Sequence, residues 1–207
     1  MQKTASYQRK TAVQRQQDLI AAGIACLGKG GLSAFTIDQI CSEAGVSRGL
    51  INHHFSSKDD LLVRIYADMT EHLVIGGDDA DPRRQLARIV ETSFDSQSFN
   101  KSNLRAWLSI WSEVANNPAL SDLHQNRYQT YKRRIVRALD AIAGEDGIEI
   151  DSDRISRQMI ALIDGLWLEY CLHSDSFSLT TAKTDCYAFL QRYDIPVRSP
   201  DHAPAGG

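Results

Sequence analysis

The chain has 207 residues, of which 43% are hydrophobic and 24% are charged. These fractions are close to those of ordinary globular proteins and exclude a largely disordered chain. Its apolar runs are short, as at Ile160–Ile163, whereas a membrane-spanning helix needs about 18 consecutive apolar residues. Residues 1–10 are polar and lack the apolar stretch of a secretory signal. We therefore expect a cytoplasmic protein without a membrane partner.

The net charge of −3 is unevenly distributed along the chain. Residues 1–60 carry seven Lys or Arg against five Asp or Glu, whereas residues 61–207 carry sixteen against twenty-one. Charge of this kind bears on binding partners rather than on the fold. It allows contact with phosphates at the N-terminal end only, without a strongly basic patch.

The four cysteines, at positions 26, 41, 171 and 186, are far apart in the sequence and include no C-x-x-C pair. This spacing argues against a zinc site and against a redox motif. We expect buried, reduced thiols, and neither a metal nor a cofactor.

Most segments repeat their apolar residues at the helical spacing i, i+3, i+4 and i+7, which predicts an all-α fold of about nine helices. In the second helix, Gln39 follows the N-cap Thr36 by three residues and predicts a capping box. The first four helices are expected to begin at Thr11, Thr36, Ser47 and Ser57. Glycines at 28, 30 and 31 end the first, Gly45 ends the second, and glycines at 76 and 77 end the fourth.

The second half of the chain repeats this pattern with longer helices. An N-cap followed by proline, Asp81–Pro82, opens the first of them. The apolar residues of the helix at about 153–173 cover more than one face, so part of that helix should pack on a partner subunit. The five expected helices lie at about 82–96, 103–115, 120–143, 153–173 and 180–193.

The stretch from Thr36 to Phe55 has the pattern of a helix-turn-helix. Two helices of under ten residues meet at a turn containing Gly45, which adopts a left-handed backbone at little steric cost. Two short packed helices without a DNA-binding role remain an equal alternative on spacing alone. The apolar side chains that would wedge the helices together are Ile37, Ile40, Val46, Ile51 and Phe55.

The second of these two helices has a polar outer face. Its donors would reach phosphates and base edges in a major groove about 12 Å wide, and Gly49 removes a side chain where the backbone would approach DNA. Adjacent residues on a helix point about 100° apart, so His53 and His54 do not form a metal site. The donors are Arg48, Asn52, His53 and His54.

Residues 36–61 resemble the signature of the tetracycline repressor (TetR) family of regulators. The resemblance implies a three-helix DNA-binding domain at 1–56, a larger helical ligand-binding and dimerisation domain at 57–195 and a flexible tail at 196–207. It also implies a homodimer on a palindromic operator. The matching residues are Thr36-Ile37-x-x-Ile40-x-x-x-Ala44 and Gly45-Val46-Ser47-x-Gly49-x-Ile51-x-x-His54-Phe55-x-Ser57-Lys58-Asp59-x-Leu61.

The same resemblance implies contacts with double-stranded DNA. Arg48 and Gly49 would lie near base edges, while both histidines and Lys58 would bind phosphates. Leu50 would either meet a thymine methyl group or be tolerated at the rim. The family usually has tyrosine at the position of Asn52, where asparagine is able to read adenine with two hydrogen bonds. The expected contact residues are Thr36, Ser47, Arg48, Gly49, Leu50, Asn52, His53, His54 and Lys58.

The C-terminal half is similar to the BetI-type branch of this family, which contains choline-responsive repressors. This resemblance implies a small-molecule effector, with choline or a related quaternary ammonium compound as the first choice. Together the two resemblances cover most of residues 10–175. The residues that carry the second one are Leu104-Arg-Ala-Trp-Leu-Ser-Ile-Trp111, Asn117-Pro118-Ala-Leu120 and Leu162-Ile-Asp-Gly-Leu-Trp-Leu168.

Aromatic residues in these segments are compatible with a cation site. Trp107 and Trp111 share one helical face, and Asp164, Trp167 and Tyr170 share another. Aromatic rings backed by a carboxylate suit a quaternary ammonium ion, which has no proton to donate. The alternative is that these side chains form the core, and that the effector is an unrelated small hydrophobic compound.

Two other classes of function fit less well. The sequence has no glycine-rich phosphate loop, no G-x-S-x-G, no H-E-x-x-H and no Glu-x-x-His of a di-iron bundle, so we expect no catalytic residues and no enzyme. A helical protein–protein adaptor that has lost DNA binding is the second alternative. The retained basic residues of the motif, Arg48 and Lys58 among them, argue against it.

Overall fold

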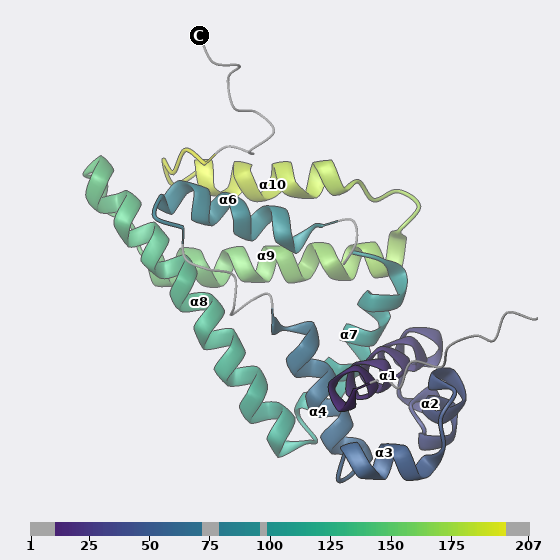
Figure 1. Cartoon of the computed structure of the whole chain (residues 1–207). Coiled ribbons are helices and arrows are strands. Elements are labelled where there is room, and N and C mark those ends of the chain that lie inside the picture. The colour runs from purple at the N-terminus through teal and green to yellow at the C-terminus, as the bar shows by residue number, and fades with distance from the viewer. Residues whose placement is uncertain (1–10, 72–78, 96–98, 198–207) are drawn as a thin grey trace, which may run out of the picture.

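The computed structural model describes residues 11–71, 79–95 and 99–197, and every regular element in these ranges is an α-helix (Figure 1). The all-α prediction is therefore confirmed, with nine helices in the described part of the chain. They are α1 (Ala12–Ala34), α2 (Ile37–Ala44), α3 (Arg48–His54), α4 (Lys58–Met69), α6 (Pro82–Ser93), α7 (Lys101–Val114), α8 (Pro118–Asp146), α9 (Ser152–His173) and α10 (Leu179–Gln191).

Side-chain caps fix where the N-terminal helices begin. At α1, Thr11 and Gln14 form a reciprocal capping box, with bonds of 3.2 and 2.8 Å. The box predicted at α2 is only half formed. Thr36 accepts from the amide of Gln39, but the Thr36 amide donates to Ala34 at 3.0 Å instead of to the Gln39 side chain. Ser47 occupies the N-cap of α3 without making a side-chain capping bond.

Several predicted boundaries differ from the structure. The first helix leaves helical geometry at Gly30 and Gly31, two of the glycines expected to end it, and the φ of Gly31 is +64°, but a further turn continues to Ala34. The fourth helix ends at Met69 rather than near residue 76, and residues 76 and 77 lie outside the described ranges. The helix predicted at 120–143 is longer at both ends, because it begins at Pro118 and continues to Asp146.

The C-terminal end of the described chain also differs from its prediction. A flexible tail was expected from residue 196, yet Ile195 is fully buried and Val197 is only 8% exposed. These apolar side chains pack into the C-terminal core, which extends the folded part to at least Val197. The rest of the predicted tail, residues 198–207, lies outside the described residues.

The helices form two clusters of buried side chains that meet at α7. One cluster fills the space among α1, α2, α3 and α4, and the other lies among α6, α8, α9 and α10. Helix α7 contributes Trp107 and Ile110 to the first cluster and Leu104 to the second. It packs closely along α1, and Gly28 lies directly against Ser102 at the beginning of α7. The N-terminal helices α1 to α4 and the C-terminal helices α6 to α10 are therefore joined by the packed contact between α1 and α7 as well as by the chain.

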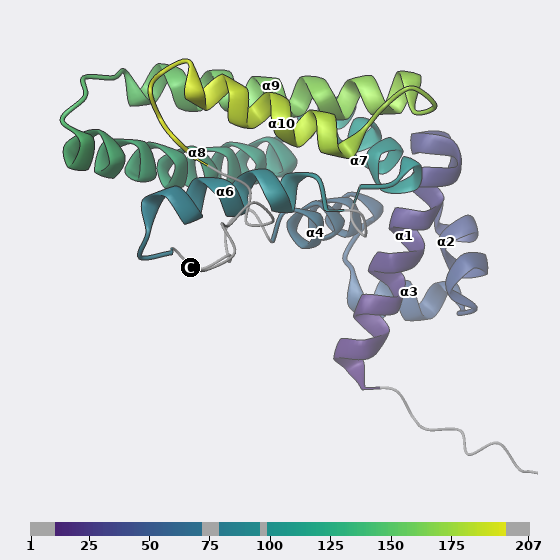
Figure 2. The same cartoon turned by 90° about the horizontal axis from the view of Figure 1, so that it is seen from above.

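The arrangement leaves the motif at one end of the molecule. In Figure 1, α3 lies at the bottom and α10 at the top, with α4 between α1 and the long α8. Figure 2 shows α9 and α10 side by side along one edge, with α8 and α6 beneath them.

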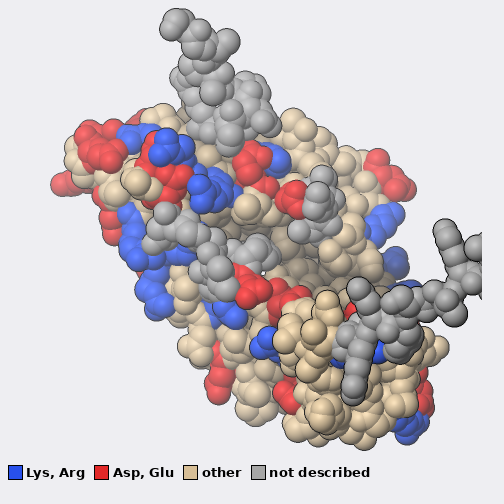
Figure 3. Space-filling model, viewed as in Figure 1, with Lys and Arg blue, Asp and Glu red and all other residues tan. Residues whose placement is uncertain are grey.

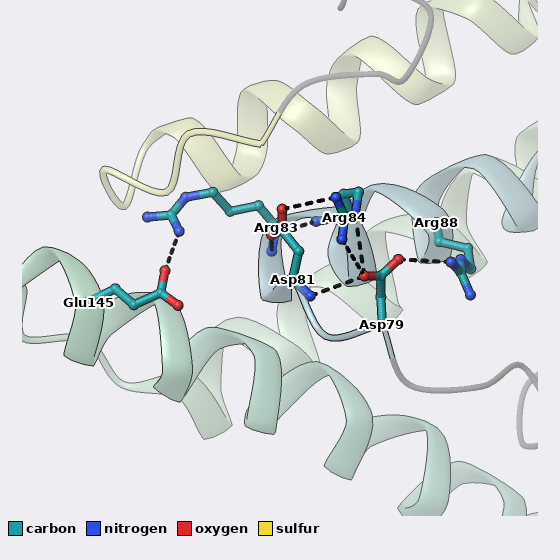
Figure 4. A network of polar contacts seen from close by, with 6 residues as sticks. All are labelled: Asp79, Asp81, Arg83, Arg84, Arg88 and Glu145. Atoms are coloured by element: carbon teal, nitrogen blue, oxygen red, sulfur yellow. Dashed lines mark hydrogen bonds and ion pairs between the residues drawn. The ribbon is translucent and has the colours of Figure 1, made fainter.

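Ion pairs tie the start of α6 to its surroundings (Figure 4). Asp79 precedes the helix and accepts from Arg84 at 3.1 Å and from Arg88 at 2.8 Å. These contacts, together with a bond from the amide of Asp81, hold the pKa of Asp79 below its usual value. Arg83 reaches across to Glu145 near the end of α8.

The four cysteines are all free thiols. Three are buried as expected, whereas Cys171 is half-buried. In the part of the chain that is described, none of the helices has the length and apolar character required to traverse a bilayer.

Candidate DNA-reading surface and effector cavity

Local sequence fixes the angle between α2 and α3. Gly45 ends α2 in the left-handed conformation, with φ +64°, and the Val46 amide then donates to the carbonyl of Cys41 at 3.0 Å. Ile40 and Ile51, one from each helix, are 0% and 1% exposed. The apolar contact and the turn together leave the opposite side of α3 facing outward.

The residues expected to contact DNA lie on α3 and at its flanks. His54 packs its ring 5.2 Å from that of His53, and Lys58 lies over the ring of Phe35 at 6.0 Å from its centre. Leu50 and His54 are half-buried. The exposed residues are Thr36, Ser47, Arg48, Gly49, Asn52, His53 and Lys58.

Arg48 has a partner that the sequence did not reveal. Its guanidinium forms a two-point ion pair with Asp38 of α2, in which Nε lies 2.6 Å from Oδ1 and Nη2 contacts Oδ2. This hydrogen bonding raises the pKa of Arg48. Ten residues separate the pair, so no helical spacing points to it. The contact holds the guanidinium across the gap between the two helices of the motif.

Charge around the motif is close to balanced. Lys29 forms an ion pair with Glu43, with Nζ 2.5 Å from Oε2. Arg48 forms an ion pair with Asp38. On the face seen in Figure 3, the part formed by α1 to α3 is mostly uncharged. Within the described residues of this region, acidic side chains therefore offset the basic ones.

A largely aromatic cavity lies between α4, α6, α7, α8 and α9. Four of the five predicted effector residues line it: Trp107, Trp111, Asp164 and Trp167. The fifth, Tyr170, does not. The complete lining is Tyr66, Ser93, Trp107, Trp111, His124, Arg127, Tyr128, Tyr131, Ile160, Ile163, Asp164 and Trp167.

Tyr170 belongs to a neighbouring aromatic cluster. Its ring centre lies 4.7 Å from that of Phe99 and 5.4 Å from that of Phe177. Although Tyr170 follows Trp167 by three residues, only the tryptophan reaches the cavity, where its indole donates to the carbonyl of Ser93 at 3.0 Å. Their position on a shared helical face therefore did not predict which of the two residues lines the cavity.

Three tryptophans and a tyrosine form one wall of the cavity. The ring centre of Trp107 lies 5.7 Å from Trp111, 5.6 Å from Trp167 and 5.6 Å from Tyr66. The contacts with Trp167 and Tyr66 are edge-to-face, which turns ring faces and edges toward the same space. Such a wall offers negative ring faces to a cation.

The residues of α8 were missed by sequence reasoning. His124, Arg127, Tyr128 and Tyr131 all line the cavity, and they follow the i, i+3, i+4, i+7 spacing of one helical face. That spacing was the available signal.

Asp164 and the pair formed by Tyr66 and His124 supply the polar chemistry opposite the tryptophans. Asp164 is an exposed residue, but desolvation by the side chains packed around its carboxyl raises its pKa to about 6, and the carboxyl forms no hydrogen bond or ion pair with another described residue. The Tyr66 hydroxyl lies 2.7 Å from Nδ1 of His124, and burial lowers the pKa of that histidine. At neutral pH the cavity is thus lined by the carboxylate of Asp164, the guanidinium of Arg127 and an uncharged imidazole.

Comparisons with known proteins agree on both parts of the chain. Residues 19–65 match the family model described as bacterial regulatory proteins of the tetR family, and residues 82–194 match the BetI-type transcriptional repressor C-terminal domain. A regulator named BetI from Pectobacterium carotovorum subsp. carotovorum (strain PC1) is 31% identical over 86% of this chain and 93% of its own. One from Serratia proteamaculans (strain 568) is 31% identical over 88% and 95%.

Solved structures show the same fold. The crystal structure of a proposed transcriptional regulator from Pseudomonas aeruginosa PAO1 has a TM-score of 0.78 and 32% identity, covering 89% of this chain and 92% of its own. A regulator from Saccharomonospora viridis, crystallised in complex with choline, has a TM-score of 0.75 and 23% identity, covering 86% and 96%.

Proposed function

Because the chain belongs to the TetR family and carries a BetI-type C-terminal domain, it is a transcriptional regulator and not an enzyme, and we propose that it represses genes as a homodimer released from DNA by a small cationic effector. One observation carries this proposal. Tyr66 lines the aromatic cavity and lies on α4, the helix whose first residue, Lys58, belongs to the DNA-reading surface. As a DNA-bound regulator, it would act in the cytoplasm.

The DNA-reading surface is α3 with its two flanks. Arg48 at the first position of the helix would leave Asp38 and donate to base edges, while Lys58 and His53 would bind phosphates. Two such helices, one from each subunit, fit successive major grooves when they are about 34–36 Å apart. This geometry favours a palindromic operator.

The outer face of α9 supports dimerisation. Leu168 and Leu172 are 44% and 64% exposed, and Ala161 and Gly165 continue the same face toward the N-terminus of the helix. Adjacent exposed leucines beside small residues suit close packing of a second helix. We assign the subunit contact to this face of α9 together with the neighbouring α10.

The cavity favours a quaternary ammonium ion as effector. Trp107, Trp111 and Trp167 present aromatic faces and edges, and Asp164 supplies the only carboxylate among the lining residues. The choline complex of the Saccharomonospora viridis regulator, a protein of the same fold, makes choline the first compound to test.

Two helices are placed to carry a signal from the cavity to the DNA. Helix α4 links Tyr66 to Lys58, and α7 links Trp107 to the contact between Ser102 and Gly28 of α1. An effector that binds more tightly to one spacing of the two reading helices shifts the population toward it. Release follows if that spacing no longer matches the operator.

Footprinting on the region upstream of the gene, repeated with millimolar choline, tests this proposal. We expect a protected palindrome that choline abolishes. Protection that choline leaves intact would reject a cationic effector and favour an unrelated small hydrophobic one. Complete lack of protection on genomic DNA fragments would instead favour the protein–protein adaptor.

A further inference from the structure

Two hydrogen-bond groups of the cavity residues are buried without a partner in the described part of the chain. They are the indole Nε1 of Trp111 and Nε of Arg127. Most buried polar groups in proteins are hydrogen-bonded, and an unpaired one costs about 1–3 kcal/mol. The indole and the guanidinium are donors only. This side of the cavity therefore lacks an acceptor.

Arg127 also lacks a counter-charge. It is half-buried on α8 and forms no ion pair with any residue in the described ranges, although Asp164 lines the same cavity from α9. Burial raises the pKa of Tyr66, and the charges of Asp164 and Arg127 act on that pKa in opposite directions. Both charges therefore line one cavity without forming an ion pair with each other.

We propose that the effector is a zwitterion, a quaternary ammonium compound that also carries a carboxylate. Its ammonium end lies among the tryptophans beside Asp164, and its carboxylate accepts from Arg127, with Trp111 as a further donor. A guanidinium binds a carboxylate through charge-assisted hydrogen bonds. This inference rests on the proposed function, which makes the cavity the effector site.

The carboxylate is needed because a simple cation leaves the arginine uncompensated. Choline has one neutral hydroxyl, which accepts a hydrogen bond but carries no charge to offset Arg127. Its ammonium would also share the cavity with a second positive charge. A zwitterion matches both protein charges, one at each end.

The test is isothermal titration calorimetry of the full-length protein with choline and with trimethylglycine, which share a trimethylammonium group. We expect trimethylglycine to bind at least tenfold more tightly. Arg127→Met, which keeps an unbranched apolar stem but removes the charge and the donors, should weaken trimethylglycine at least tenfold and strengthen choline, because a like charge is lost. Arg133→Met, on the exposed side of the same helix and outside the cavity, should change neither affinity.

The outcomes separate this inference from the function on which it rests. Tighter binding of choline than of trimethylglycine, or equal losses for both ligands in a folded Arg127→Met protein, would reject the zwitterion and keep the cationic effector. Lack of heat with both ligands would reject the cationic effector and the zwitterion together. Thermal denaturation of each variant shows whether it is folded.

Discussion

The residue best placed to read DNA is paired with an acid of its own chain. The side chains of Arg48 and Asp38 are each 66% exposed, so their ion pair contributes little to stability. The ion pair does hold the guanidinium in one orientation, across the gap between α2 and α3. In the proposed complex, binding to a base would therefore exchange one acceptor for another, at small cost.

Replacing Arg48 with alanine should weaken operator binding by about 1–3 kcal/mol, the range for losing a specific base contact. The dimer should remain intact, because Arg48 is exposed and distant from α9. Fluorescence anisotropy with the footprinted operator measures the affinity. Arg133→Ala removes an exposed arginine of α8 as a matched control, and equal affinities for the two variants would remove Arg48 from the reading surface.

A second prediction about a single residue concerns Asp164 and the pH dependence of effector binding. Its pKa is raised to about 6 by desolvation, so the carboxyl is ionised above pH 6 and becomes neutral as the pH falls through 6. A cation prefers the ionised form. The affinity for choline should therefore be highest at pH 7–8 and fall steadily toward pH 5.

Calorimetry across this range checks the prediction. Asp164→Asn cannot titrate, so its choline affinity should be weak and nearly independent of pH between 5 and 8. His124, whose pKa is lowered by burial, stays neutral over most of the range and adds repulsion only at its acid end. A wild-type profile as flat as that of the variant would show that Asp164 does not face the ammonium.

At the scale of elements, α7 is the unexpected connection. Helix α4 continues the chain directly from the motif, and α7 also lines the cavity while packing along α1. A Cβ on Gly28 would lie 2.0 Å from Oγ of Ser102 and 2.8 Å from its carbonyl oxygen. Only glycine allows the two helices to approach this closely.

Gly28→Ala should consequently destabilise the protein by about 1–3 kcal/mol, the usual cost of overpacking. Chemical denaturation followed by circular dichroism measures the change. Gly144→Ala is the control: this glycine lies in α8 with open space at its Cβ, so alanine should stabilise by up to about 1 kcal/mol. A Gly28 variant as stable as wild type would mean that α1 and α7 separate at little cost.

The hydrogen bond between Tyr66 and His124 joins α4 to α8 at the cavity. Tyr66→Phe removes it while keeping the ring, so choline should still bind, but the drop in operator affinity that choline causes should shrink severalfold. Tyr193→Phe is the matched control, since its hydroxyl bonds to Gln158 at 2.8 Å on an exposed surface. If choline lowers operator affinity as much in the Tyr66→Phe variant as in wild type, α7 would be the main connection between the cavity and the DNA-reading surface.

For the whole molecule, function depends on how two subunits are paired. In the proposed dimer, α3 of each subunit would read half of a palindrome, and the contact through α9 and α10 would set the distance between the two halves. The exposed leucines of this proposed contact lie on the same helix as Asp164 and Trp167, so an effector in the cavity would act on the helix that holds the dimer together.

Leu172→Glu should convert the dimer to a monomer and reduce operator binding strongly, because a buried, unpaired carboxylate is costly. Light scattering after size-exclusion chromatography reports the mass. Val13→Glu introduces the same charge at an equally exposed apolar residue, 68% against 64%, but on α1, and should remain dimeric. A dimeric Leu172 variant would place the subunit contact elsewhere.

The local sequence pattern was enough to identify the helix-turn-helix formed by α2 and α3. The N-cap at Thr36, the left-handed Gly45 and the apolar spacing from Ile40 to Ile51 act within about twenty residues, and the structure has all three. The family resemblance rests on the same stretch, and the family comparisons agree with it. The helical secondary structure was equally predictable, because a repeat of apolar residues with a period of 3.6 residues is a property of the local sequence.

What the tertiary structure alone decided is which helices face one another. A helical pattern shows that one side is buried but not against which partner, so it did not separate Tyr170 from Trp167 or bring the α8 face to the cavity. The pairing of Arg48 with Asp38 and the contact of Gly28 with Ser102 likewise join residues of different helices. Each depends on the angle at which two helices cross, and the spacing within one segment does not contain that angle.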